Sequence, residues 1–219
     1  MAFVHLHVHT EYSLLDGSNK IKEYVARVKE LGMTAAAITD HGVMYGCMDF
    51  YKECLAQGIK PILGCEVYVS PGSRFDKDPG TTDDRYYHLV LLAETTEGYY
   101  NLCKIVSAGF TEGFYYKPRV DREILAKYHE GIIALSACLA GEIPRHISMG
   151  DYQGAVRAAK DLSAIFGPDH FYLELQDHGI PEQRHVDQQL IRMHEETGLP
   201  LVCTNDVHYT RASQSSARV

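Results

Sequence analysis

The sequence contains no long apolar run and does not begin like a secreted protein. No segment of its 219 residues approaches the length of a membrane-spanning helix, and the first residues do not combine a basic stretch with an apolar one. We therefore expect a cytoplasmic protein with no membrane partner.

Cysteine pairs at the spacing of metal or redox motifs are also missing. The six cysteines are scattered, without a CxxC motif or the dense framework of a small secreted domain. The sequence therefore predicts reduced thiols rather than disulfides. These cysteines are Cys47, Cys54, Cys65, Cys103, Cys138 and Cys203.

Basic residues are too few for a broad nucleic-acid-binding face. The chain has 21 Lys and Arg against 29 Asp and Glu, which gives a net charge of −8. This balance argues against binding by counterion release over a basic surface. A nucleic-acid substrate stays open, because carboxylates gathered around metal ions add to such a deficit and the bound cations reverse the sign locally.

The chain has the composition of an ordinary globular domain, with 45% hydrophobic and 23% charged residues. Its length suits one domain, which we place at residues 1–219. Apolar runs predict seven strands, at 3–7, 35–40, 59–69, 88–94, 132–138, 171–176 and 201–206.

Helical spacing of apolar residues fills most of the gaps between these strands, around 21–31, 44–55, 99–106, 155–165 and 186–193. In the second of these stretches the stripe consists of Met44, Met48, Tyr51 and Leu55. Alternation of strands and helices predicts parallel pairing, and near-continuous apolar strands are covered on both faces. We therefore expect an α/β fold, a distorted seven-stranded (β/α)7 barrel of the TIM type.

Two segments depart from this alternation. Segment 70–87 contains Pro, Gly and Asp residues that break any period, and we predict a long exposed loop. Segment 211–219 is polar and lacks a further strand or core helix. We expect it to be a fragment end within a longer protein.

Imidazoles and carboxylates gather where predicted strands end. Residues two apart in an extended strand point to the same side, so His7 with His9 and Asp206 with His208 can each bind one ion as a pair. Asp40-His41 ends a third strand, and Glu66 lies inside a fourth. These groups are the ligands of zinc, manganese or iron, so the sequence predicts a metal site.

Seven blocks of sequence together resemble one family. They are HLHVHTEYSLLDG (5–17), ITDHG (38–42), GCEVY (64–68), HLVLLA (88–93), FYYKPR (114–119), LSACL (135–139) and TNDVHY (204–209). The chain is similar to the polymerase and histidinol phosphatase (PHP) domains, in particular to those that open the alpha subunit of bacterial DNA polymerase III. The resemblance spans the whole chain and implies a (β/α)7 barrel with up to three metal ions at the C-terminal ends of the strands.

Carried over position by position, the resemblance implies nine metal ligands, and all nine are present. They are His7, His9, Asp16, His41, Glu66, His88, Cys138, Asp206 and His208. His88 begins its strand instead of ending it, and Cys138 stands where many stand-alone relatives have an imidazole. His5 shares a face with His7 and His9 but lies outside this set, so we expect it to orient a ligand.

Structural roles are the alternatives at several positions. Cys138 can be a small core residue, and Asp16 can be a turn or cap residue. The remaining histidines are expected to be packed or surface residues. They are His129, His146, His170, His178, His185 and His194.

The implied ligand set favours a phosphate ester as substrate. Its carboxylates and thiolate carry about −4, three divalent ions carry +6, and a bridging hydroxide leaves a centre of about +1. Such a hydroxide can attack phosphorus without a side-chain nucleophile. Arg119 is the predicted phosphate clamp, with a surface arginine as the alternative. The predicted catalytic residues are Asp206, His208, Glu66, His41 and Arg119.

We expect two to three divalent ions, zinc or manganese first and iron or magnesium as alternatives. The leading hypothesis is a metal-dependent phosphodiesterase that acts as a 3′–5′ exonuclease inside a DNA polymerase, whose nucleotidyl-transfer palm lies outside this chain. Its partners would be a DNA 3′ terminus, the remaining polymerase domains and other replisome subunits. The alternatives are a stand-alone phosphatase for a small phosphomonoester such as histidinol phosphate, and a metal-stabilised structural or docking module.

Overall fold

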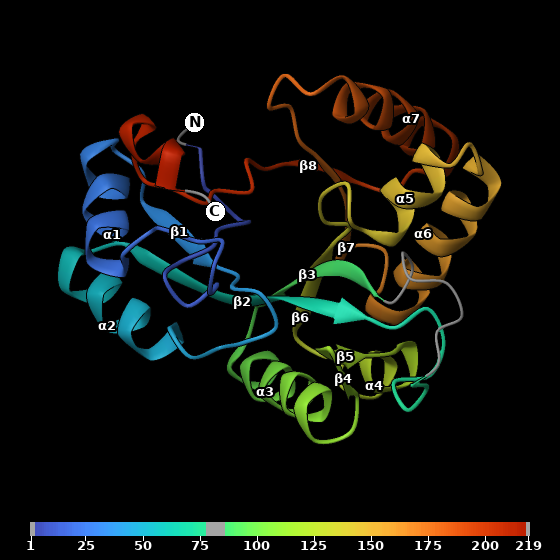
Figure 1. Cartoon of the computed structure of the whole chain (residues 1–219), viewed down its shortest axis with the longest axis horizontal. Coiled ribbons are helices and arrows are strands. Elements are labelled where there is room, and N and C mark those ends of the chain that lie inside the picture. The colour runs from blue at the N-terminus through green and yellow to red at the C-terminus, as the bar shows by residue number, and fades with distance from the viewer. Residues whose placement is uncertain (1–2, 78–85, 218–219) are drawn as a thin grey trace.

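A curled mixed sheet forms the centre of the structure, with helices around its outside (Figure 1). The computed structural model describes residues 3–77 and 86–217. The strands in these residues are β1 (Ala35–Ile38), β2 (Lys60–Val69), β3 (Tyr87–Ala93), β4 (Phe114–Tyr115), β5 (Lys117–Val120), β6 (Ile132–Leu135), β7 (Phe171–Leu175) and β8 (Leu201–Cys203). The helices are α1 (Ile21–Glu30), α2 (Cys47–Gln57), α3 (Thr96–Thr111), α4 (Arg122–Lys127), α5 (Glu142–Ser148), α6 (Tyr152–Phe166), α7 (Pro181–Thr197) and the 3-10 helix η1 (Ala212–Ala217).

The strand order is β4-β5-β2-β3-β6-β7-β8, and β1 pairs with the first half of β2. Four of the pairings among the described strands are parallel, whereas β3 runs antiparallel to both β2 and β6, and β4 runs antiparallel to β5. The prediction of purely parallel pairing is therefore wrong for β3. Val69 at the end of β2 pairs with Tyr87 at the start of β3. The chain therefore turns back at the end of β2, whereas a parallel β3 would have to start beside the beginning of β2.

The first predicted strand, 3–7, does not form as a regular strand. The carbonyls of His5 and Val8 accept hydrogen bonds from the N–H groups of Ala37 and Thr39, so the segment lies beside β1. The Val8 N–H, however, donates to the Thr39 hydroxyl oxygen at 2.8 Å rather than to a backbone carbonyl. This side-chain bond interrupts the ladder. The segment is extended but is not a paired strand.

A complete seven-stranded barrel is not confirmed. Within the described ranges, the first extended segment meets the last one through an isolated parallel bridge, Val8 with Val207. The strand β8 stops short of Asp206, whose φ of 43° lies in the left-handed region. The sheet is therefore a half-barrel, and apolar side chains that include Ala37 and Val90 fill its inner face.

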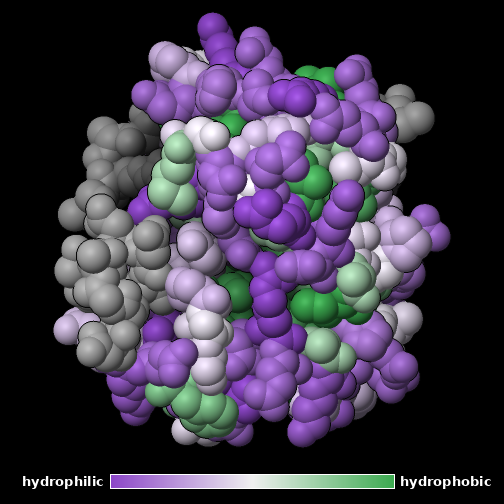
Figure 2. Space-filling view, turned by 90° about the vertical axis from the view of Figure 1, so that its right-hand side faces the viewer, coloured by the Kyte–Doolittle hydropathy of each residue, from purple (hydrophilic) through white to green (hydrophobic). Residues whose placement is uncertain are grey.

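The five predicted helices are confirmed as α1, α2, α3, α6 and α7, and α4 and α5 are additional. The latter two span 6 and 7 residues. Such short helices leave too little periodicity in the sequence to be recognised. The outward face of α5, α6 and α7 is mainly hydrophilic (Figure 2).

The helix α2 turns a different face to the core from the one that the apolar stripe predicts. Cys47, Phe50 and Cys54 are buried, whereas Met48 and Leu55 are 52% and 55% exposed. Both sets have helical spacing, so the pattern alone does not separate them. Packing against α1 and β2 selects the cysteine-containing stripe, whose small side chains allow a close approach.

The predicted exposed loop at 70–87 is partly ordered against the fold. Arg74 is buried and its guanidinium pairs with Asp121 at 3.0 Å and Glu112 at 2.6 Å. The prediction of exposure is therefore wrong at Arg74, and residues 78–85 lie outside the described residues. No helix in the described ranges is both long enough and apolar enough to cross a membrane.

Candidate metal centre

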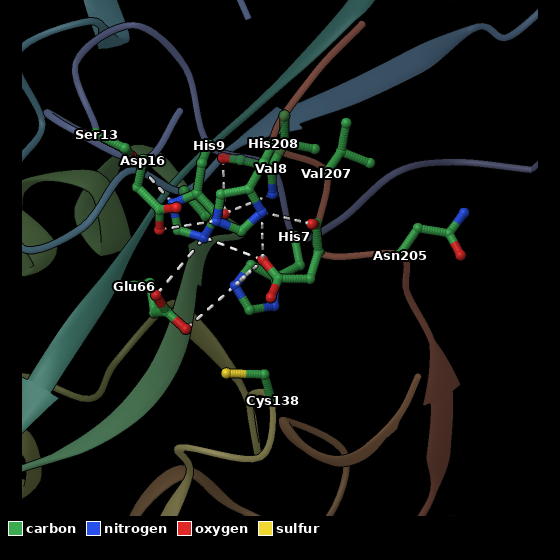
Figure 3. A network of polar contacts seen from close by, with 12 residues as sticks. His7, Val8, His9, Ser13, Asp16, Glu66, Cys138, Asn205, Val207 and His208 are labelled. Atoms are coloured by element: carbon green, nitrogen blue, oxygen red, sulfur yellow. Dashed lines mark hydrogen bonds and ion pairs between the residues drawn. The ribbon is translucent and has the colours of Figure 1, made fainter. Parts of the chain in front are cut away.

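Nine side chains converge at one end of the curled sheet, and Figure 3 labels most of them. They come from the first extended segment, from the loop before α1, from β2 and β3, and from the segments that follow β1, β6 and β8. Contacts of the described residues join all nine into one cluster. The nine are His7, His9, Asp16, His41, Glu66, His88, Cys138, Asp206 and His208.

Glu66 lies at the centre of the cluster. Its Oε2 is 2.6 Å from Nδ1 of His41, and its Oε1 is 3.0 Å from Nδ1 of His88 and 3.2 Å from Nε2 of His7. The side chain is 1% exposed. A buried carboxylate that faces several imidazoles can bridge more than one cation.

Two aspartates complete the carboxylate set. Oδ1 of Asp206 is 3.3 Å from Nε2 of His7 and 3.2 Å from Nε2 of His9. Oδ2 of Asp16 is 2.9 Å from Nε2 of His41 and 3.1 Å from Nε2 of His208. Asp206 therefore faces two imidazoles of the first extended segment, whereas Asp16 stands between imidazoles of two different segments.

Several of these atoms are buried and, apart from the ion-pair contacts given above, have no hydrogen-bond partner. They include Nε2 of His7 and His9, Nδ1 of His41, both carboxylate oxygens of Glu66 and Oδ1 of Asp206. Buried polar atoms almost always form hydrogen bonds, so a group of such atoms that face one another without hydrogen bonds needs an explanation. Divalent cations satisfy imidazole nitrogens and carboxylate oxygens together.

Among the described residues, three overlapping groups of side chains could each hold one ion. In each group the potential ligand atoms lie within 4.8 Å of one another. The groups are His7, His9 and Glu66; His41, Glu66 and His88; and His9, His41 and His208. The groups share His9, His41 and Glu66, so any ions held by them would lie close together.

The position of His88 follows from the reversed direction of β3. His88 pairs with Tyr68 in the antiparallel ladder, near the C-terminal end of β2. A strand that runs antiparallel to its neighbours begins at the end of the sheet where those neighbours finish. Cys138, in the segment after β6, is less central, with its Sγ 3.9 Å from Nδ1 of His88.

Burial and charge shift the pKa values within the cluster in opposite directions. Burial lowers the pKa of His9 to about 4. Burial acts on His7 in the same sense, but the carboxylates of Asp206, Glu174 and Glu66 overcome it and raise its pKa well above the ordinary value. Burial alone would raise the pKa of Glu66, yet the neighbouring imidazoles hold it well below its ordinary range. The carboxylates therefore stay ionised and offer negative charge to a cation.

Asp40 lies next to the cluster but holds a loop rather than facing the imidazoles. Its carboxylate accepts hydrogen bonds from the Thr10 N–H at 2.6 Å and from the Ser13 hydroxyl at 2.7 Å. The Ser13 hydroxyl oxygen also lies 3.0 Å from Nδ1 of His9. Asp40 thus fixes the loop that orients His9 and leads to Asp16.

One functional carboxylate was missed at the level of the sequence. Glu174 in β7 is buried, and its Oε1 lies 2.8 Å from Nδ1 of His7. Such a contact holds the imidazole so that the opposite nitrogen points at an ion. The signal was a glutamate inside the apolar run 171–175. His5, which was expected to orient a ligand, packs its ring edge-on against Phe3 instead.

Arg119 is not brought to the cluster. Its side chain is 1% exposed, and its guanidinium donates to the backbone carbonyls of Gly113, Arg74 and Asp76. Its donors therefore serve the loop after β2 and the turn before β4, which argues against the predicted phosphate clamp. Several other histidines bond to residues outside the cluster, as expected. They are His129, His146, His170, His178 and His194.

Comparison with known families decides what kind of domain carries this cluster. The model of the PHP domain family matches residues 5–178. The chain belongs to the PHP domain family. It is 49% identical over 218 residues to the DNA polymerase III subunit alpha of Treponema pallidum, covering 100% of this chain and 19% of that relative. It is 47% identical over 221 residues to the same subunit of Thermus aquaticus, covering 99% of this chain and 18% of that relative.

The PHP chain thus spans about a fifth of the length of these relatives. Solved structures agree on the fold. A structure from Bifidobacterium adolescentis, assigned as a metal-dependent phosphoesterase, has a TM-score of 0.56 and 16% identity, covering 94% of this chain and 88% of that one. An amidohydrolase from Chromobacterium violaceum has a TM-score of 0.60 and 15% identity, with the same coverages of 94% and 88%.

Proposed function

We propose that this PHP domain is a metal-dependent phosphodiesterase of a DNA polymerase III alpha subunit and acts as a 3′–5′ exonuclease. The observation that carries the proposal is the group of buried imidazole nitrogens and carboxylate oxygens that face one another around Glu66 without hydrogen bonds. Burying such a group is costly unless cations bind to it, which supports a metal-dependent site. The polymerase relatives supply the context in which a DNA 3′ end would reach it.

The donor set fits divalent ions of borderline softness. His7, His9 and Glu66 would hold one ion, and His41 and His88 would join Glu66 around a second. Bound ions supply Lewis acidity for phosphoryl oxygens and lower the pKa of water toward neutrality. The residual positive charge of such a centre favours the binding of a phosphate ester.

The side chains themselves orient the groups around the reacting phosphate. Glu174 holds His7, and Ser13 with Asp40 holds His9, so the inner nitrogens of both imidazoles point at the centre. Ser13 is 1% exposed and its hydroxyl donates to Asp40, so it is not free to attack phosphorus. Water is therefore the nucleophile in the proposed reaction.

Substitution of the cluster tests the assignment directly. The metal-loaded protein and its longer polymerase parent should shorten a primer that ends in a 3′ mismatch, and Asp206→Asn should lower that rate by about a hundred-fold or more, as expected when a metal ligand loses its charge. Asp177→Asn is the matched control, because Asp177 is exposed and lies outside the cluster. Gel analysis of primer length measures the rate, and circular dichroism checks that both variants are folded.

Two outcomes would remove the exonuclease assignment. One is that no divalent ion supports shortening by the wild-type polymerase. The other is that activity survives Glu66→Gln combined with His41→Ala. Turnover of histidinol phosphate by the same preparation would favour the stand-alone phosphatase instead, and we expect none.

The metal content is a separate prediction. Three overlapping ligand groups are too many for a single ion, so we expect two to three divalent ions per chain. Elemental analysis of metal-supplemented and desalted protein measures this. Less than one equivalent would contradict the proposed centre.

One observation favours a second role as a docking module. Met48 and Leu55 on α2 are more than half exposed although both are apolar. Replacing both with Gln should leave nuclease activity unchanged. If α2 packs against another part of the polymerase, the melting temperature of the longer protein should fall while that of the 219-residue chain stays the same.

A further inference from the structure

A cavity of about 610 Å³ opens directly beside the metal cluster. Three of the proposed ligands line it, namely Asp16, His41 and His88. Half of the remaining lining residues are aromatic, namely Tyr12, Tyr45, Tyr68, Tyr86 and Phe110, and we call this cavity the tyrosine pocket. Its size lies within the range of roughly 300–1,000 Å³ that is usual for small-ligand sites.

The cluster also borders a second cavity, of about 540 Å³. That cavity shares other members of the cluster, Cys138, Asp206 and His208, and none of those that line the tyrosine pocket. The cluster therefore stands between two cavities. A phosphodiester carries an organic group on each side of the phosphorus atom, whereas a monoester carries one, so this arrangement suits a diester.

The aromatic wall is packed against the proposed ligands. The ring of Tyr68 stacks on His41 at a centroid distance of 6.2 Å, and the ring of Tyr86 stacks on His88 at 6.1 Å. Gly42 has a φ of 65°, and a Cβ at this position would lie 2.9 Å from the Tyr68 ring. The chain thus uses a glycine to let this tyrosine approach the cluster.

The rim of the tyrosine pocket carries large, exposed side chains. Tyr45 is 67% exposed and Leu15 is 86% exposed. Leu15 has a φ of 68°, a region that a leucine rarely adopts, and it directly precedes Asp16. Strained and exposed apolar residues beside a reactive centre mark a place where a ligand is received.

The tyrosine pocket also contains one cation outside the cluster. Lys117 lines it and places its Nζ 5.4 Å from the centroid of the Tyr68 ring. Arg119, two residues further, is buried among backbone carbonyls and does not reach the pocket. Lys117 is therefore the side chain in this block that can meet a backbone phosphate.

We propose that the tyrosine pocket is a nucleobase subsite that receives the unpaired terminal base of a DNA 3′ end by aromatic stacking while its phosphodiester lies at the metal cluster. Aromatic side chains accept any base, because every base has a π face. A paired base is already stacked in its duplex, so the pocket selects frayed or mispaired ends. The subsite deepens the exonuclease function proposed above and rests on it for the position of the phosphate.

Binding measurements test the subsite without relying on cleavage. Two short single-stranded oligodeoxynucleotides carry the same terminal phosphorothioate linkage, one ending in a thymine nucleotide and the other in an abasic residue. The metal-loaded protein should bind the thymine probe about ten-fold more tightly, as measured by fluorescence anisotropy. Tyr45→Ala should abolish this preference, whereas Tyr45→Phe, which keeps the ring, should retain it.

Two controls separate stacking from other effects. Tyr100→Ala removes a tyrosine that is 60% exposed and lines neither cavity, and it should leave the preference unchanged. Lys117→Gln should weaken the binding of both probes equally and reduce the salt dependence of binding. Equal binding of the two probes by the wild-type protein, or a preference that survives Tyr45→Ala, would overturn the subsite.

The same probes without the phosphorothioate keep the two proposals apart. If the base preference holds in binding but no probe is shortened, the subsite stands and the exonuclease function fails. If both probes are shortened at equal rates, and Tyr45→Ala changes neither rate, the exonuclease function stands and the subsite fails.

Discussion

At the residue scale, the cluster depends on side chains that position the proposed ligands as much as on the ligands themselves. Glu174 touches His7 on the side away from Glu66 and also accepts hydrogen bonds from Gln176 and Thr204. A buried carboxylate with three such contacts fixes both the rotation and the proton position of the imidazole.

We expect Glu174→Gln to weaken metal binding by about ten- to a hundred-fold while the protein stays folded. The reason is that a neutral amide orients His7 less firmly and makes its Nε2, which faces the cluster, a weaker ligand for a metal ion. Metal titration followed by calorimetry measures the affinity. Glu94→Gln is the matched control, since Glu94 pairs with His170 at the surface. Equal affinities for wild type and Glu174→Gln would show that this contact has no part in metal binding.

Two glycines with the same backbone conformation differ in what surrounds them. Gly42 and Gly32 have φ values of 65° and 74°, but a Cβ would meet the Tyr68 ring at the first position and no atom within 4 Å at the second. In both alanine variants the free energy of unfolding should fall by about 1–2 kcal/mol, because alanine is strained in the left-handed conformation. Gly42→Ala should lose more, because the tyrosine must also move. Urea denaturation of the two variants measures the difference, and equal losses would contradict the close approach.

At the element scale, the direction of a single strand decides which residues can share the site. Because β3 runs antiparallel to β2, its first residues, including His88, lie at the end where β2 finishes. A parallel β3 would have placed His88 at the opposite end of the sheet. The element that breaks the alternating pattern is therefore also one that completes the cluster.

The helix α6 provides a prediction on pH. Asp151 is its N-cap, and its carboxylate accepts a hydrogen bond from the Gly154 N–H at 2.8 Å. This bond, with His146 nearby, lowers the Asp151 pKa below its ordinary value of 3.8. A depressed carboxyl pKa contributes stability above the unfolded value, and this contribution is lost as the pH falls through the folded value.

We therefore expect the wild-type protein to melt at a higher temperature than Asp151→Asn at neutral pH and the gap to close in acid. Calorimetric melting of both proteins between about pH 7 and pH 2 measures the gap, since the loss begins near the ordinary pKa of 3.8 and continues below it. Asn still accepts the Gly154 hydrogen bond, so the comparison isolates the charge. If the difference in melting temperature widened as the pH falls, the Asp151 charge would not stabilise the folded protein in the way proposed.

At the scale of the whole molecule, the cluster joins the two ends of the described chain. The first extended segment contacts the segment after β8 through the bridge between Val8 and Val207, and both segments contribute members of the cluster. Figure 1 shows the first and the last described segments on the same side of the molecule as α1. Bound ions would therefore hold the edges of the half-barrel to each other.

Removal of metal should accordingly destabilise the entire domain. We expect EDTA to lower the melting temperature, because an ion that binds only the folded state contributes about 2.7 kcal/mol when its concentration is a hundred times Kd. Differential scanning calorimetry with and without EDTA measures the shift, and Asp206→Asn should reduce it. A melting curve that EDTA leaves unchanged, with metal loss verified, would exclude a structural contribution from the ions.

The sequence by itself determined the chemistry of this protein. The imidazole and carboxylate blocks, their order and the predicted helices are local features, so the family and the α/β class were predictable without coordinates. The likeness to the family also predicted the nine members of the cluster, which the structure brings together.

Only the tertiary structure decided how these parts face one another. The reversed β3, the buried stripe of α2, the burial of Arg119 and the contact of Glu174 with His7 all depend on residues distant in the chain. Local periodicity cannot separate two equally spaced stripes, nor can it tell a surface arginine from one enclosed by carbonyls. Long-range packing selects among these alternatives, because burial favours the arrangement that satisfies the most polar groups.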